Sequence, residues 1–138
     1  MTEKTAPDIR ALGDNYCFAC GLDNPYGLKL GFQVEGDRFV ARKTLSREYQ
    51  SYTGVAHGGI ISTLLDEAMG GYLVALGEKA VTGRLTVRYR RPTPIGEELR
   101  VAGWLVERRG RFFKMKAEVA LADGTVTAEG TAEMAVVE

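Results

Sequence analysis

The sequence predicts an α+β fold in which a curved antiparallel β-sheet wraps around one long central helix. Two features predict it: a single strongly apolar segment, AHGGIISTLLDEAMGGY at 56–72, and alternation of apolar and polar residues with period two after residue 78. One sheet folded around one helix is the simplest layer arrangement that covers both. The 138 residues, 45% hydrophobic and 26% charged, have the size and mixture of a single compact domain.

The charge balance excludes some classes of partner. The 18 basic and 18 acidic side chains cancel, so the chain has no overall positive field for nucleic acid or an anionic membrane. The start MTEKTAPDIR is polar, and no apolar run reaches the roughly 18 residues of a membrane span. We therefore expect a cytoplasmic protein that binds neither nucleic acid nor membrane.

Residues 1–27 lack periodicity and contain NYCFACGLDNPYG, whose Gly and Asn-Pro signals indicate a turn-rich lead-in. The domain proper is expected over 28–138. It should open with two short strands, 28–34 and 38–45, joined by the turn EGDR.

The apolar segment predicts a helix over 60–76, because apolar residues fill most of its wheel. Such a helix should be covered by protein on nearly every side, and Gly77 is a natural C-terminal stop. The internal pair Gly70 and Gly71 costs a helix roughly 1 kcal/mol per residue relative to alanine. Close packing against another backbone would explain the pair.

Four long strands should follow the helix. In VTGRLTVRYRRP one face is expected to carry Val81, Leu85, Val87 and Tyr89, and the other Thr82, Arg84, Thr86, Arg88 and Arg90. The strands ELRVAGWLVE, FFKMKAEVAL and VTAEGTAEMAVV come next, and the Asp-Gly turn before the last is a strong hairpin signal.

Cys17 and Cys20 are the only cysteines, which excludes a disulfide framework. Their C-x-x-C spacing suits a metal, but a closed structural zinc site needs four ligands. We expect a packed turn with no metal and no cofactor. A metal shared between two subunits or completed by His57, and a redox role, are alternatives.

The segment HGGIISTLLDEAMG resembles the signature of acyl-CoA thioesterases with the hotdog fold, related to phenylacetate-degradation thioesterases in the 4-hydroxybenzoyl-CoA thioesterase superfamily. TGRLTVRYRRPTPIG and the lead-in CFACGLDNPYGLKL extend the resemblance over nearly the whole chain. It implies a hotdog fold and hydrolysis of an acyl-CoA to free acid and CoA.

The resemblance also implies roles for residues. The Gly58 backbone N–H, directly after His57, would polarise the thioester carbonyl, and Asp66, nine positions after the histidine, would be general base or nucleophile. Thr82 matches a Ser or Thr that assists the attacking water. Gln50 stands where the family often has an Asn or Gln ahead of the histidine.

The chemistry needs residues of these types. Amides at a helix start stabilise a developing oxyanion, and Gly58 and Gly59, lacking Cβ, let a thioester approach closely. A carboxylate either deprotonates water or attacks the carbonyl to give an anhydride, and the sequence leaves both open. His57 either takes part directly or shapes the loop before the helix. Glu67 either forms an ion pair or orients a neighbour.

The helical rise separates Gly58 from Asp66 by roughly 12 Å, on different faces. They cannot reach one carbonyl within one chain, so the spacing predicts a homodimer whose sites combine Gly58 of one subunit with Asp66 of the other. Pairing of two dimers into a tetramer is a further alternative.

The expected substrate, an acyl-CoA, carries phosphates. A row of arginines on or near one strand face could bind them: Arg84, Arg88, Arg90 and Arg91. An ordinary solvated face is the alternative. Two other functions stay open, namely a non-catalytic acyl-CoA-binding protein and a hotdog hydratase or dehydratase. The latter typically uses a histidine in a different motif, and this chain has only His57.

Overall fold

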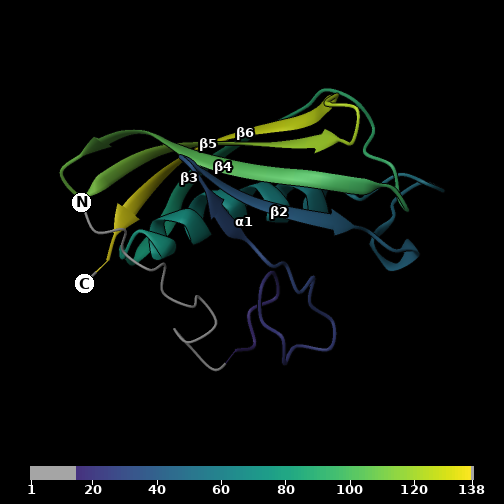
Figure 1. Cartoon of the computed structure of the whole chain (residues 1–138), viewed down its shortest axis with the longest axis horizontal. Helices are drawn as coiled ribbons and strands as arrows, with labels where there is room; N and C mark the ends of the chain where they lie inside the picture. The colour runs from purple at the N-terminus through teal and green to yellow at the C-terminus, as the bar shows by residue number, and fades with distance from the viewer. Residues whose placement is uncertain (1–14, 138) are drawn as a thin grey trace.

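The structure is a computed structural model, which describes residues 15–137. Helix α1 (Gly58–Ala75) lies against one six-stranded antiparallel sheet, which curves over it in Figure 1. The strands are β1 (Gln33–Glu35), β2 (Arg38–Thr44), β3 (Ala80–Tyr89), β4 (Glu98–Arg109), β5 (Phe112–Leu121) and β6 (Val126–Val136), in the spatial order β1-β2-β4-β5-β6-β3. A short 3₁₀ helix, η2 (Arg47–Tyr49), precedes α1. The predicted α+β arrangement is confirmed.

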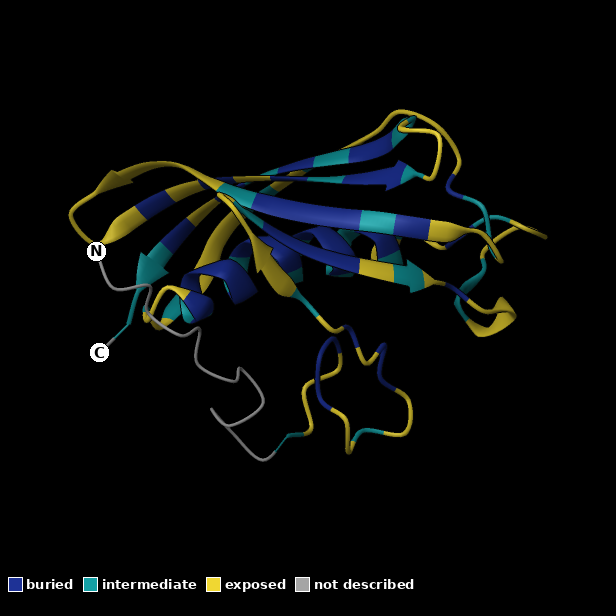
Figure 2. Ribbon diagram, in the orientation of Figure 1, coloured by how far each residue is buried: buried dark blue, intermediate teal, exposed yellow. Residues whose placement is uncertain are grey.

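The core lies between helix and sheet, and α1 is dark blue over most of its surface in Figure 2. Its buried side chains include Leu64, Leu65, Met69 and Leu73, each 0% exposed. Leu28 and Leu30 join the same cluster from residues 15–32, which Figure 1 draws on the side of α1 away from the sheet. The helix is thus covered from two sides, as its filled wheel predicts. No helix within 15–137 has the length and apolarity to cross a membrane.

The first strand differs from its predicted range of 28–34, because β1 spans only Gln33–Glu35. Lys29 has φ of 52°, a left-handed conformation that interrupts an extended chain. The N–H groups of Leu28 and Leu30 donate instead to the carbonyls of Phe18 and Ala19, at 2.8 and 2.9 Å. This segment therefore belongs structurally to the lead-in. β2 ends one residue before its predicted bound.

Helix α1 begins two residues earlier than predicted, and Gly77 with φ of 90° follows its end. The expected close backbone approach is not at Gly70, where an added Cβ would meet only the Met134 side chain at 3.6 Å. It is at Gly103 on β4, where an added Cβ would lie 2.2 Å from the Ala68 carbonyl oxygen. At Gly70 the expected approach is therefore not seen among the residues described, and the glycine that permits the contact between α1 and β4 lies on the strand.

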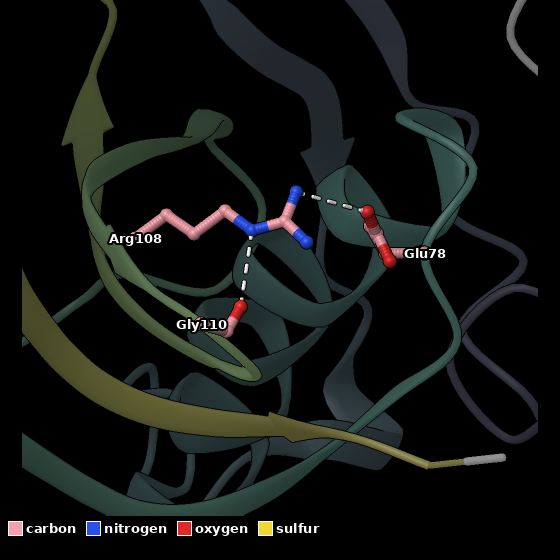
Figure 3. Close-up of polar contacts among 3 residues, drawn as sticks. All are labelled: Glu78, Arg108 and Gly110. Carbon is pink, nitrogen blue, oxygen red and sulfur yellow. Dashed lines mark hydrogen bonds and ion pairs between the residues drawn. The ribbon is translucent and has the colours of Figure 1, made fainter.

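The turn after α1 is tied to the β4–β5 hairpin (Figure 3). Arg108 Nη1 lies 3.2 Å from Glu78 Oε1, and Arg108 Nε donates to the Gly110 carbonyl at 3.1 Å. The guanidinium also stacks over the Phe113 ring, 4.8 Å from its centroid. Such an exposed pair contributes little stability, on the order of 0–1 kcal/mol, but it fixes where the helix ends against the sheet.

Candidate active site

The first turn of α1 has one free amide. His57 is the N-cap: its Nδ1 accepts from the Gly59 N–H at 3.0 Å, and its carbonyl accepts from Ile60 and Ile61. This contact corresponds to the loop-shaping role considered for His57. Within residues 15–137 the Gly58 N–H has no partner, and it stands at the positive end of the helix dipole. An oxygen that gains negative charge would be stabilised there.

Tyr89, at the end of β3, fixes this turn. Its hydroxyl donates to the Gly58 carbonyl at 2.9 Å and lies 2.6 Å from Ser62 Oγ. The ring lies beside Gly58, since an added Cβ there would be 3.5 Å from it. The sequence placed Tyr89 only on an apolar face and missed this role. The available signal was its phenol, which needs a hydrogen-bond partner.

Asp66 is held from the other end of β3. Thr82 Oγ1 donates to Asp66 Oδ1 at 2.7 Å. The Asp66 side chain is partly exposed and Thr82 is exposed, so a ligand or a second subunit has access to the pair.

The predicted faces of β3 are right from Arg84 onward and wrong before it. The register against β6 shifts between Thr82 and Arg84, a bulge that leaves Gly83 as the extra residue. Thr82 therefore pairs with the core residue Met134 and faces α1, while Val81 is 53% exposed. A strict period of two cannot reveal such a bulge, although a glycine inside a strand is a known sign of one.

Gln50 supports the loop ahead of the helix. Its Oε1 accepts from the Gly54 N–H at 3.2 Å, and its backbone forms a bridge with Ala56. The structure thus places Gln50 in the loop that leads to His57.

A pocket of about 290 Å³ opens beside the free amide. It is lined by Val55, Ala56, Gly58, Ile61, Tyr89, Arg90, Arg91, Pro92 and Thr93. Its wall is largely apolar, with two arginines at one side. This combination suits a thioester that carries a charged handle.

The four arginines expected near the substrate are not gathered at this pocket. Arg90 lines it but pairs with Glu129, and Arg84 pairs with Glu133 at 3.8 Å. Arg91 also lines it and is exposed, with no ion pair among the residues described. Arg88 lines a separate pocket together with Trp104 and Lys116.

Glu67 differs from an ordinary surface carboxylate, which is either surrounded by water or paired with a cation. No ion pair is found for it within 15–137, and the Cys20 thiol hydrogen-bonds its carboxyl group. Burial raises the pKa of Glu67, and the neighbouring charge of Asp66 raises it further. Burial likewise raises the pKa of the Cys20 thiol, and Glu67 adds to the shift. Cys17, Cys20 and Glu67 place their Sγ and carboxylate atoms within 4.8 Å of one another.

A comparison with known protein families identifies the superfamily. Residues 53–128, more than half of the chain, match the thioesterase superfamily. The protein belongs to this superfamily. No curated protein matches its sequence.

Solved structures share the fold, which is the hotdog fold expected from the motif. A thioesterase superfamily protein aligns over 86% of this chain with TM-score 0.82 and 28% identity, and the chain spans 62% of that protein's length. A Streptococcus mutans protein bound to acetyl-CoA aligns over 78% of this chain and 88% of its own, with TM-score 0.73 and 24% identity. The E. coli PaaI protein from the phenylacetic acid degradation operon gives the same TM-score at 17% identity, over 78% and 83%.

Proposed function

We propose that the protein hydrolyses an acyl-CoA thioester to the free acid and CoA, at sites shared between two subunits. One observation carries the proposal: Gly58, whose N–H has no partner within 15–137, lines a pocket at one end of β3, and an accessible carboxylate, Asp66, is held at the other end. Superfamily membership supports the same reaction class.

In the proposed reaction the thioester carbonyl accepts a hydrogen bond from the Gly58 N–H, which stabilises the oxyanion as it forms. Asp66 then either takes a proton from the attacking water or attacks the carbonyl carbon itself. Thr82 donates to Asp66 Oδ1 and so fixes the carboxylate with its second oxygen free for that step. The CoA thiolate leaves in either case and takes up a proton that comes from the water. In the second route a water must first hydrolyse the anhydride, which releases the acid and restores Asp66.

The edge of the sheet supports the shared site. β3 is the last strand in the order, none of its ten residues is buried, and its outer backbone edge has no partner strand within 15–137. A long exposed edge of this kind is a place where another chain can pair. Two copies of β3 paired antiparallel about a two-fold axis through Thr86 would bring Thr82 opposite Tyr89 of the partner subunit, because Gly83 is the extra residue of the bulge.

This pairing would join the two halves of the site. The Thr82 hydroxyl donates to Asp66, and the Tyr89 hydroxyl donates to the Gly58 carbonyl. Each Asp66 would therefore lie near the Gly58 turn of the other subunit, although the two are about 12 Å apart along one helix. We accordingly propose a homodimer with two equivalent sites; the pairing of dimers into a tetramer stays a prediction.

Recognition of CoA is proposed for the arginine side of the pocket. A phosphate needs cationic or amide donors, and Arg91 is exposed there with no close ion pair among the residues described, although its charge reaches Asp123. Arg90 would have to break its ion pair with Glu129 before it could bind a phosphate. The relative bound to acetyl-CoA supports CoA as the handle. Arg88 lies in the separate pocket and is a weaker candidate.

The test is a panel of short, long and aromatic acyl-CoAs, with free CoA measured by chromatography because the exposed Cys17 thiol would consume a thiol reagent. We expect turnover, a loss of at least about a hundredfold in kcat for Asp66→Asn, and a loss of about tenfold for Thr82→Val. Circular dichroism checks that each variant folds.

Two results would count against the proposal. Undiminished turnover by Asp66→Asn removes this carboxylate from the mechanism. Tight binding of acyl-CoA without release of CoA across the whole panel would instead identify a binding protein, and hydration of an unsaturated acyl-CoA would identify a hydratase.

A further inference from the structure

We propose that Cys17, Cys20 and Glu67 form a binding site for one thiophilic divalent cation of the Zn²⁺ class, which fastens the lead-in to helix α1. The Sγ atoms and a carboxylate oxygen of these residues lie within 4.8 Å of one another. The sequence offered only two thiols for a metal. The structure supplies a third donor, from a residue 47 positions beyond Cys20.

The turn that carries the thiols is tightly built. The Gly21 N–H donates to the Cys17 carbonyl at 2.9 Å, so the segment from Cys17 to Gly21 forms a closed turn. A Cβ at Gly21 would lie 2.4 Å from the Cys17 nitrogen, so no other residue fits there without a shift of the backbone. The turn therefore presents both sulfur atoms toward the same point on α1.

Glu67 gives the site a reason to bind a cation. A desolvated carboxylate is costly unless a positive charge lies beside it. Among residues 15–137 no lysine, arginine or histidine forms an ion pair with Glu67, and its neighbours are the two thiols. A divalent cation would supply the missing positive charge and engage all three groups at once.

The donors fit zinc better than magnesium or calcium. Two sulfurs and one oxygen match the soft and borderline ligands of Zn²⁺, whereas hard cations take oxygen alone. Bond lengths of about 2.0–2.3 Å place tetrahedral donors roughly 3.5–3.8 Å apart. The atoms would close by about 1.3 Å at most, and the exposed Cys17 leaves room for that and for a water as fourth ligand.

The site is separate from the proposed chemistry. Consecutive helical residues point about 100° apart, so Asp66 faces Thr82 on β3 while Glu67 faces the lead-in. Metal binding is thus expected whether or not the protein hydrolyses thioesters.

The test uses the full, untagged chain, reduced and stripped of metal by a chelator, with free thiols counted first. Co²⁺ titration should give one equivalent per chain with the sulfur-to-cobalt charge-transfer absorption, and Zn²⁺ should displace it. Cys17→Ser and Glu67→Gln should each weaken binding at least about tenfold. Asp23→Asn removes a lead-in carboxylate outside the cluster and should bind as the unchanged chain does.

A second readout separates lost binding from lost folding. At one fixed Zn²⁺ concentration, the rise in melting temperature should be the same for the unchanged chain and Asp23→Asn, and clearly smaller for Cys17→Ser and Glu67→Gln. Absence of the charge-transfer absorption in the fully reduced chain would overturn the proposal. Equal Co²⁺ affinity in Glu67→Gln would do so as well, because the thiols alone would then account for binding.

Discussion

Within the first turn of α1, hydrogen bonds decide which backbone groups remain to meet a ligand. His57 occupies the Gly59 amide, and the His57 carbonyl occupies the amides of Ile60 and Ile61. Tyr89 holds the Gly58 carbonyl from the opposite side. The unpartnered Gly58 N–H is therefore a consequence of the whole turn, and the residues that hold the turn should matter to catalysis without touching the thioester.

Tyr89→Phe tests this positioning role. The change removes the hydroxyl that bridges the Gly58 carbonyl and Ser62 Oγ but keeps the ring beside Gly58. We expect kcat to fall about tenfold with KM nearly unchanged, because the amide would stabilise the transition state from a less fixed position. Stability should fall by only about 1 kcal/mol.

Steady-state kinetics on the best acyl-CoA and urea unfolding measure the two effects. A purely structural role would instead lower stability and leave kcat per folded molecule as it was. Tyr16→Phe, at a tyrosine of the lead-in, provides a comparison outside the turn.

The sequence identifies the candidate residues of the site unevenly. Gly58 and Asp66 are proposed from the resemblance of the motif around His57, and a regular helix keeps the spacing of that motif. Thr82 is found by the motif but misplaced by periodicity, since the bulge at Gly83 reverses its face. Tyr89 is missed, because its partners Gly58 and Ser62 lie 31 and 27 residues away and no local pattern records such contacts.

At the level of elements, β4, β5 and β6 form where alternation predicts them, but the register shifts between Leu105 and Glu107 on β4 and between Val119 and Ala120 on β5. β1 does not form over its predicted range, because residues 28–32 meet the lead-in through Leu28 and Leu30. A hydrophobic run shows that a segment is buried, but not whether it is buried as a strand. The closest approach of α1 to β4 is likewise hidden from the sequence, because the glycine that permits it, Gly103, lies inside an ordinary strand pattern.

Two glycine substitutions should therefore have opposite effects. Gly103→Ala forces a Cβ to within 2.2 Å of the Ala68 carbonyl oxygen, so helix and strand must separate. We expect a loss of at least about 2 kcal/mol in the free energy of unfolding. Gly70→Ala meets only the Met134 side chain at 3.6 Å and should stabilise the protein by up to about 1 kcal/mol.

Urea denaturation of both variants at one protein concentration is the measurement. A fixed concentration is needed because dimerisation would add to apparent stability. Equal stability of Gly103→Ala and the unchanged protein would show that β4 can move away from α1 at no cost.

On the scale of the whole molecule, the open question is how Gly58 and Asp66 come to act together. Within one helix the two residues lie about 12 Å apart, too far to act on one carbonyl. The sequence predicts a second subunit for this reason. The structure adds the unpaired edge of β3, with Thr82 and Tyr89 near its two ends. When this edge pairs antiparallel with its copy, the Thr82 end of one strand lies beside the Tyr89 end of the other. A shared site requires this arrangement.

Complementation between two inactive variants tests that arrangement. Gly58→Pro removes the amide hydrogen at the first helical position, where proline is tolerated, and His57 with ψ of 135° suits a residue before proline. Asp66→Asn removes the acid. Either homodimer should be inactive, because every one of its sites lacks the donor or the acid.

A heterodimer purified through two different tags should recover about half of the wild-type kcat per dimer. One of its two sites unites an intact Gly58 with an intact Asp66 from the other chain, and the remaining site lacks both. Gly58→Ala, which keeps the amide, shows how much of the loss in Gly58→Pro comes from bulk. A heterodimer as inactive as its parents, with both chains folded and paired, would place the whole site within one chain and remove the reason for the two-fold axis.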